Sequence, residues 1–164
     1  MATQPAQRER PHGVRRAFLR APIWLYRHGL GWILGERFLL LTHIGRKTGR
    51  PRQAVLEVVH HDAASDTYFI LSGWGHRSDW LLNVEKTPEV SIDIGRRHLD
   101  ARAERIAPAE AAGVLGRYMR RYPRAFRQLG RFMLGEALPP GDEGCRRLAE
   151  KLPMVALRPV APVH

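Results

Sequence analysis

Residues 39–52 read Leu-Leu-Leu-Thr-His-Ile-Gly-Arg-Lys-Thr-Gly-Arg-Pro-Arg, and the rest of the chain is organised around this stretch. An apolar run of strand length enters a turn that contains Gly45 and Gly49, and a second strand-like run, residues 53–61, leaves it. Glycine lets the backbone adopt positive φ angles and approach a ligand closely. Successive backbone N–H groups in such a turn can form a concave anion site. The pattern therefore predicts two strands joined by a basic turn.

The charges of this turn suggest a ligand. Arg46, Lys47, Arg50 and Arg52 supply positive charge, and Thr48 supplies a hydroxyl. A guanidinium offers a planar fork and an ammonium offers a point charge, so the mixture suits a phosphate. Two interpretations stay open at this level: a phosphate-bearing cofactor held at the corner, or a solvated hairpin turn with ordinary surface charge. The stretch is not a P-loop, because the lysine lies between the glycines and no helix follows.

Length and composition indicate one globular domain. The chain has 164 residues, of which 44% are hydrophobic, enough for a substantial core. The single cysteine, Cys145, excludes an internal disulfide and a cysteine-built metal site. Residues 1–11 are polar and lack the apolar segment of a secretory signal, and no apolar run reaches transmembrane length. We therefore expect a cytoplasmic protein.

The net charge of +11 is unevenly distributed. Residues 1–52 hold 11 Lys or Arg and 2 acids, whereas residues 53–110 hold 6 basic residues and 10 acids. Residues 111–135 hold 6 arginines and no acid. Such patches attract phosphates, anionic lipid or nucleic acid, but the acidic middle argues against a uniformly basic coat.

The N-terminal third is expected to contain an arm and a helix. Residues 1–13 predict a mobile polar arm, and residues 14–35 predict a helix broken near Gly29-Leu30-Gly31. Trp, Tyr and Arg beside aliphatic residues in the segment 14–35 are typical of an interfacial membrane helix. The other interpretation, which we favour, is a helix that packs over the barrel end with its arginines in water. Residues 14–164 would then form a single domain, with peripheral membrane contact through 14–35 left open.

The remaining elements predict a mainly β fold with helical cover (α+β). Alternating and apolar runs indicate strands at residues 37–44, 53–61, 67–72, 89–94, 98–106 and 154–157. Helices are expected from Ser78 as N-cap, from Pro108, after Pro123 and over residues 142–151. Six short strands with few helices predict a small antiparallel barrel.

No motif indicates nucleophilic or metal chemistry. Gly-x-Ser-x-Gly, His-Glu-x-x-His and Cys-x-x-Cys patterns do not occur. The adjacent His60 and His61 would point to opposite faces of a strand, so they do not predict a metal site. His43 could touch a ligand, although a lone histidine is more often packed or solvated. Trp74, between two glycines, could wall a flat heterocycle, whereas Trp80 is expected in the core.

Taken together, the motifs resemble those of the deazaflavin-dependent nitroreductases, which are split β-barrel oxidoreductases. The resemblance spans roughly residues 37–160 and is carried by segments 41–52, 72–75, 79–84, 88–90 and 152–159. It implies a split barrel, often homodimeric, with coenzyme F-420 (8-hydroxy-5-deazaflavin) at the barrel mouth. The coenzyme performs the hydride chemistry, so no catalytic protein residue and no metal are expected.

The resemblance also implies a set of site residues. The coenzyme phosphate would be held by Arg46, Lys47, Thr48, Gly49 and Arg52. The deazaflavin ring would lie near Ser72, Gly73 and Trp74, with Trp80 supporting it. Substrate would enter beneath the late helices, near Tyr118, Tyr122 and Phe126. Two departures matter: family members with nitroreductase activity carry a lysine where this chain has Gly73, and they place several tyrosines in the late helical segment.

The function expected from these observations is hydride transfer from the reduced coenzyme to a small electron-poor molecule, such as a quinone or a nitro compound. A cofactor carrier of the same fold is an alternative. FMN, which also bears a phosphate, is a less favoured cofactor. A basic membrane-surface or nucleic-acid module is a further alternative, favoured by the arginines of residues 117–131, although we expect no nucleic-acid partner.

Overall fold

The computed structural model describes residues 27–28, 30–73 and 75–161, and its centre is a closed antiparallel barrel. The strands are β1 (Phe38–Ile44), β2 (Pro51–Asp62), β3 (Thr67–Leu71), β4 (Glu89–Ile94), β5 (Arg97–Arg105) and β6 (Met154–Pro159). Their order around the barrel is β1-β2-β3-β6-β5-β4, and β1 pairs with β4 to close it. The predicted small antiparallel barrel with helical cover is confirmed.

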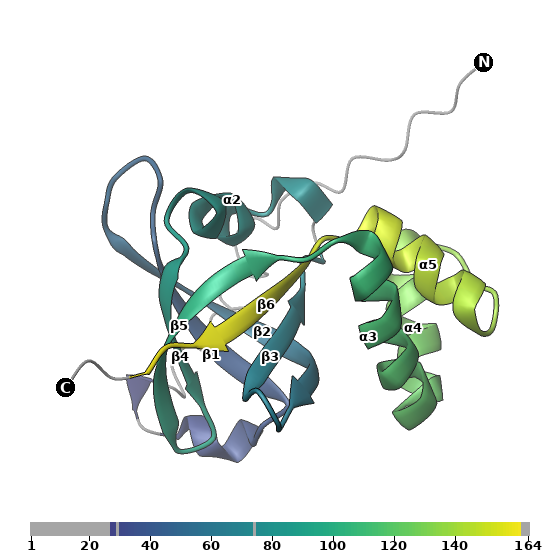
Figure 1. Cartoon of the computed structure of the whole chain (residues 1–164), viewed down its shortest axis with the longest axis horizontal. Helices are drawn as coiled ribbons and strands as arrows, with labels where there is room; N and C mark the ends of the chain where they lie inside the picture. Colours follow the sequence, from purple (N-terminus) through teal and green to yellow (C-terminus); the bar gives the residue numbers. More distant parts are fainter. Residues whose placement is uncertain (1–26, 29, 74, 162–164) are drawn as a thin grey trace.

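Helices occupy two positions around this barrel. The helix α2 (Asp79–Lys86) lies over one barrel end, beside the turn that joins β1 to β2 (Figure 1). The other helices, α3 (Pro108–Arg121), α4 (Pro123–Leu134) and α5 (Asp142–Lys151), gather as a layer beside the barrel (Figure 1). Short 3₁₀ helices occur at η1 (Gly31–Leu34) and η2 (Gly75–Arg77).

The alternation of side chains along the strands divides the core into two parts. Residues that point into the barrel, among them Leu39, Leu41 and Ile92, pack with Trp80 on the inner face of α2. Residues on the outer face of β2, β3 and β6 pack under the helical layer, and they include Val59, Phe69 and Ala156. Because successive strand residues point to opposite faces, one set of short strands supplies both cores.

The strand boundaries differ from the predicted ones by one or two residues. The largest differences concern β2, which begins at Pro51 rather than Gln53, and β6, which runs on to Pro159. Pro51 pairs with Ile44 as the first residue of β2, a position where a missing backbone N–H is tolerated. The turn-forming residues before Gln53 therefore led to a predicted start of β2 that is two residues too late.

The predicted start of α2 after Ser78 is confirmed, whereas the predicted capping role of the Ser78 side chain is wrong. Ser78 precedes α2, but its side chain makes no capping hydrogen bond. Its hydroxyl instead hydrogen bonds to the hydroxyl of Ser72, which donates in turn to the carbonyl oxygen of Gly75 (2.7 Å). Both serines therefore hold the loop that leads into α2.

The predicted arm at residues 1–13 and most of the helix predicted at residues 14–35 lie outside the described residues. At the end of that segment the structure has η1. None of the helices in the described ranges combines the length and the apolar composition that a membrane span requires.

Two helical glycines provide a test of the packing under the helical layer. A Cβ on Gly130 of α4 would lie 2.6 Å from Cγ of Leu138, whereas a Cβ on Gly113 of α3 would meet no atom within 4 Å. We expect Gly130→Ala to lower the free energy of unfolding by about 1–3 kcal/mol through overpacking. Gly113→Ala should raise it by about 0.5–1 kcal/mol, because alanine is the better helix former. Chemical denaturation of both variants is the measurement, and equal effects would contradict this packing.

Candidate functional site

A cavity of about 830 Å³ lies between the basic turn, β2, α2 and α4. The basic turn contributes Gly45, Arg46, Lys47 and Thr48, and β2 contributes residues from Arg52 to Glu57 and Val59. Trp80 and Asn83 come from α2, and Leu129 and Met133 come from α4. Segments that are far apart in the sequence thus meet at one end of the barrel and along the outer face of β2.

The backbone of the basic turn is largely occupied by its own hydrogen bonds. The N–H of Gly45 donates to Arg50 O (2.8 Å), and the N–H of Gly49 donates to Gly45 O (2.8 Å). The N–H of Arg50 donates to the hydroxyl of Thr48 (3.3 Å). Gly49 has a φ of 67°, which only glycine adopts readily. The N–H groups of Gly45, Gly49 and Arg50 are therefore engaged within the protein, and a continuous row of free backbone N–H groups is not available to an anion at this turn.

Arg46 connects the basic turn to α2. Its backbone N–H and its Nη1 both donate to Oδ1 of Asn83, each at 3.0 Å. Its Nη2 forms an ion pair with Asp79 Oδ1 (3.2 Å), and its carbonyl oxygen accepts from Lys86 Nζ (3.0 Å). Asp79, Asn83 and Lys86 follow one another at helical spacing, so one face of α2 holds the turn. The guanidinium predicted to bind phosphate is therefore engaged within the protein.

Lys47 and Arg52 are the cations that remain at the cavity wall. Both side chains are exposed, and no acidic side chain of the described residues forms an ion pair with either. Arg52 pairs in register with His43 across β1 and β2, so the two side chains lie on the same side of the sheet. Thr48 also lines the cavity, whereas Gly49 is not among its lining residues.

His43 is buried at the end of β1 and lines the cavity, with 4% of its surface exposed. Its Nδ1 lies 3.1 Å from Nδ2 of Asn83. Burial, and secondarily the positive charge of Arg52, lower the pKa of His43 to about 4. The imidazole is therefore neutral at physiological pH.

The far end of the cavity is apolar. Val55, Leu71, Leu129 and Met133 line it. Gly73 also lines it, and a Cβ there would lie 2.7 Å from Cε and 3.0 Å from Sδ of Met133. In this chain Met133 fills the space that any larger side chain at position 73 would need.

The structure places only some of the predicted ring-binding residues on the cavity wall. Gly73 and Trp80 line the cavity, and Trp80 is also part of the barrel core, as predicted. Ser72 is fully buried, and its hydroxyl is used inside the loop, so it is not on the cavity wall. Trp74 lies outside the described residues. A role of Ser72 or Trp74 at the ring stays a prediction.

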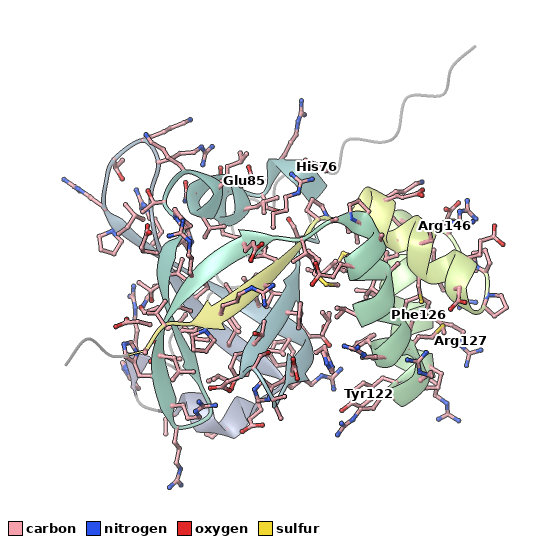
Figure 2. All side chains as sticks on the ribbon, viewed as in Figure 1. His76, Glu85, Tyr122, Phe126, Arg127 and Arg146 are labelled. Atoms are coloured by element: carbon pink, nitrogen blue, oxygen red, sulfur yellow. The ribbon has the colours of Figure 1, made fainter. Side chains whose placement is uncertain are left out.

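The predicted substrate residues do not line this cavity. Phe126 is 2% exposed and belongs to the core under the helical layer, and Tyr122 is 48% exposed. In Figure 2, Tyr122 extends from the lower end of the helical layer, away from α2. Tyr118 reaches the cavity only through Glu57, to which its hydroxyl donates (3.3 Å). Burial and the adjacent Glu57 raise the pKa of Tyr118 to about 12, so the phenol is protonated.

The sequence interpretation missed several cavity residues, namely Gln53, Glu57, Asn83, Leu129 and Met133. A signal existed for Asn83, because Asp79, Asn83 and Lys86 recur at helical spacing beside the apolar face of α2. Leu129 and Met133 recur at helical spacing with Phe126 in the helix expected after Pro123, and periodicity alone does not divide such a face. Within the described ranges, no three His, Cys, Asp or Glu side chains gather into a group that could hold a metal ion.

Comparison with solved structures places the barrel among known folds. An F420-H2 dependent reductase (FDR-A) superposes with a TM-score of 0.52 at 19% identity, covering 76% of this chain and 96% of that one. A protein described as a domain-swapped dimer gives 0.52 at 19% identity, covering 84% and 100%. HutZ, the heme storage protein of Vibrio cholerae, gives 0.52 at 18% identity, covering 84% and 92%. At such identities the likeness shows a shared fold, and that fold carries more than one function.

The family is established by sequence. The model of the F420H2-dependent quinone reductases matches residues 19–130, more than half of the chain. The match includes the basic turn, the loop at Gly73 and all of α2, and it confirms the resemblance drawn from the motifs. The chain belongs to the F420H2-dependent quinone reductase family, and it is an oxidoreductase that depends on the deazaflavin coenzyme F-420.

Proposed function

We propose that the chain binds reduced coenzyme F-420 in the 830 Å³ cavity and reduces a quinone-like acceptor at its apolar end. The observation that carries this proposal is the polarity of the cavity wall. Lys47 and Arg52 lie at one end, and Leu129 and Met133 lie at the other. A volume of 300–1,000 Å³ is usual for small-molecule sites.

The residues present fit the coenzyme. Its phosphate requires cations that are not already neutralised, and Lys47 and Arg52 meet that requirement, with the Thr48 hydroxyl beside them. Its flat ring requires an apolar wall, which Trp80 and Val55 supply. When bound, the reduced deazaflavin supplies the hydride.

The protein's part in the reaction is to position the coenzyme and the acceptor and to exclude water. Arg46 and Asn83 fix the basic turn against α2, so the free cations are held at one place. Leu129 and Met133 present apolar surface to the acceptor's end of the cavity, which favours a flat hydrophobic molecule. Glu57 also lines the cavity, and its carboxylate is engaged within the protein, because it accepts a hydrogen bond from Tyr118 and forms an ion pair with Arg37 (3.5 Å).

The direct test is a titration of the purified protein with the reduced deazaflavin coenzyme and with FMN, followed by steady-state oxidation of the bound coenzyme by menadione. We expect tighter binding of the deazaflavin and turnover with the quinone. Binding without turnover would favour the carrier alternative, and preference for FMN would overturn the proposal.

The first site prediction concerns the cationic end. Lys47→Ala removes an exposed cavity cation, and a hydrogen bond to a charged group is worth about 1.5–3 kcal/mol. We expect the Kd for the coenzyme to rise about tenfold to a hundredfold. The matched control is Arg50→Ala, which removes the same charge from the same turn at an exposed position outside the cavity lining.

Arg50→Ala should change the Kd less than about threefold, because a screened charge outside the site acts weakly. Equal losses in the two variants would show that only the overall field of the turn matters. Calorimetric titration of both variants at one ionic strength separates these outcomes.

The second site prediction concerns the apolar end. Met133→Ala should raise the KM for menadione several-fold and leave the Kd for the coenzyme unchanged, because Met133 lies away from the cations. The control is Met119→Ala, which truncates a partly buried methionine of α3 that packs on the same core without lining the cavity. If Met119→Ala raises the KM equally, the effect is one of helix packing rather than of contact with substrate.

Association into a homodimer is also proposed. It is implied by the family resemblance, and one neighbour of the same fold is described as a domain-swapped dimer. Light scattering after size-exclusion chromatography should give twice the 18.7 kDa of the chain. A monomer mass at micromolar concentration would contradict it.

A further inference from the structure

His43 is a polar residue of the cavity wall to which the proposed function assigns no task. It is the last residue but one of β1, it is 4% exposed, and its hydrogen bond among the described residues is with Asn83. A buried histidine held by a single partner has one ring nitrogen left over. The question is which nitrogen carries the proton and where the other one points.

The orientation of the Asn83 amide follows from Arg46. The backbone N–H and Nη1 of Arg46 are donors only, and both lie 3.0 Å from one side-chain atom of Asn83, so that atom is the carbonyl oxygen. The amide nitrogen of Asn83 therefore faces Nδ1 of His43 at 3.1 Å. Because an amide nitrogen is a donor, Nδ1 accepts, and the ring proton is on Nε2.

The Nε2–H group is directed at the cavity. Within the described part of the chain, no side-chain nitrogen or oxygen is sealed from solvent without a hydrogen-bond partner. Nε2 has no partner among these residues, so it reaches the open space that His43 lines. The neighbouring side chain on the same side of the sheet is Arg52, its register partner on β2.

We propose that His43 is a ligand-binding residue, whose Nε2–H donates a hydrogen bond to a phosphate oxygen of the coenzyme held by Arg52. This assignment rests on the proposed function and deepens it by naming a neutral donor beside the cations. Burial keeps the imidazole uncharged, so it adds a directional bond without a further positive charge. The amide of Asn83 fixes both the tautomer and the ring orientation, as outer partners do for metal-bound histidines.

Two isosteric variants separate ligand binding from structure. His43→Asn places an amide near the position of Nδ1, so it keeps the contact with Asn83 and loses the donor toward the cavity. His43→Gln extends an amide N–H toward the position of Nε2 and keeps that donor. We expect the Kd for oxidised coenzyme F-420 to rise about tenfold for His43→Asn and to stay within about threefold for His43→Gln. Equal losses in the two variants, or no loss in His43→Asn, would overturn the proposal.

A second readout does not depend on turnover. In protein with ¹⁵N-labelled histidine, the His43 ring at pH 7 should show a protonated Nε2 and an unprotonated Nδ1, assigned by the signal missing in His43→Asn. Adding oxidised coenzyme should shift the Nε2–H resonance and slow its exchange with water. A proton on Nδ1, or a Nε2–H signal that the coenzyme leaves unchanged, would overturn the role of His43.

Failure of the proposed function gives a different result. If the wild-type protein does not bind the coenzyme, the cofactor site itself is wrong. If the wild-type protein binds it and His43→Asn binds it equally well, the cofactor site stands and only the assignment of His43 fails.

Discussion

The site depends on the hydrogen bonds that the side-chain amide of Asn83 makes with Arg46 and His43. The amide oxygen accepts from the backbone and the side chain of Arg46, and the amide nitrogen donates to His43. Asn83 is 4% exposed, so each of these groups would lose a partner that water cannot easily replace if the amide were removed. One side chain of α2 thereby holds the turn between β1 and β2 and the ring of His43 near the end of β1.

This arrangement divides the positive charges of the turn into two kinds. Arg46 is engaged with Asp79 and Asn83 and holds the turn in place, whereas Lys47 and Arg52 stay available at the cavity. A similar use of arginine occurs at the same barrel end, where Arg105 contacts both Glu85 of α2 (3.1 Å) and His76 of η2 (2.9 Å), two residues labelled beside each other in Figure 2. The acids of the middle segment, among them Asp79 and Glu85, thus serve to orient arginines around α2. A motif rich in arginine and lysine does not by itself say which cations are free.

The sequence was sufficient for the fold, and the structure places Lys47, Thr48 and Arg52 of the predicted site residues around one cavity. The reasons are physical. Strand alternation, the glycines of the basic turn and the prolines that begin α3 and α4 are local signals, and each element they predicted is present in the described residues. The assignment of Phe126 to the substrate failed to match the cavity because a period of 3.6 residues places Phe126, Leu129 and Met133 on one face of α4. Only the packing of α4 across the sheet puts Phe126 in the core and the other two at the cavity. Ser72 shows the same limit, since its hydroxyl is engaged by Ser78 and Gly75, which only the folded loop brings beside it.

Gly73 and Met133 extend this argument to specificity. The absence of a Cβ at position 73 allows the Met133 thioether to lie against the backbone of the loop, where a side chain would need space that it occupies. A lysine at this position, as in the nitroreductases that the chain resembles, would require α4 to move or Met133 to turn away. It would also add a charge at the apolar end of the cavity, opposite the end where Lys47 and Arg52 lie. The two residues therefore act as a pair, because Gly73 permits the close approach of the Met133 side chain and that side chain forms an apolar part of the cavity wall. In this chain the packing between α4 and a loop defines the cavity end at which we propose that the acceptor binds, and its apolar wall supports our proposal of an uncharged, flat acceptor.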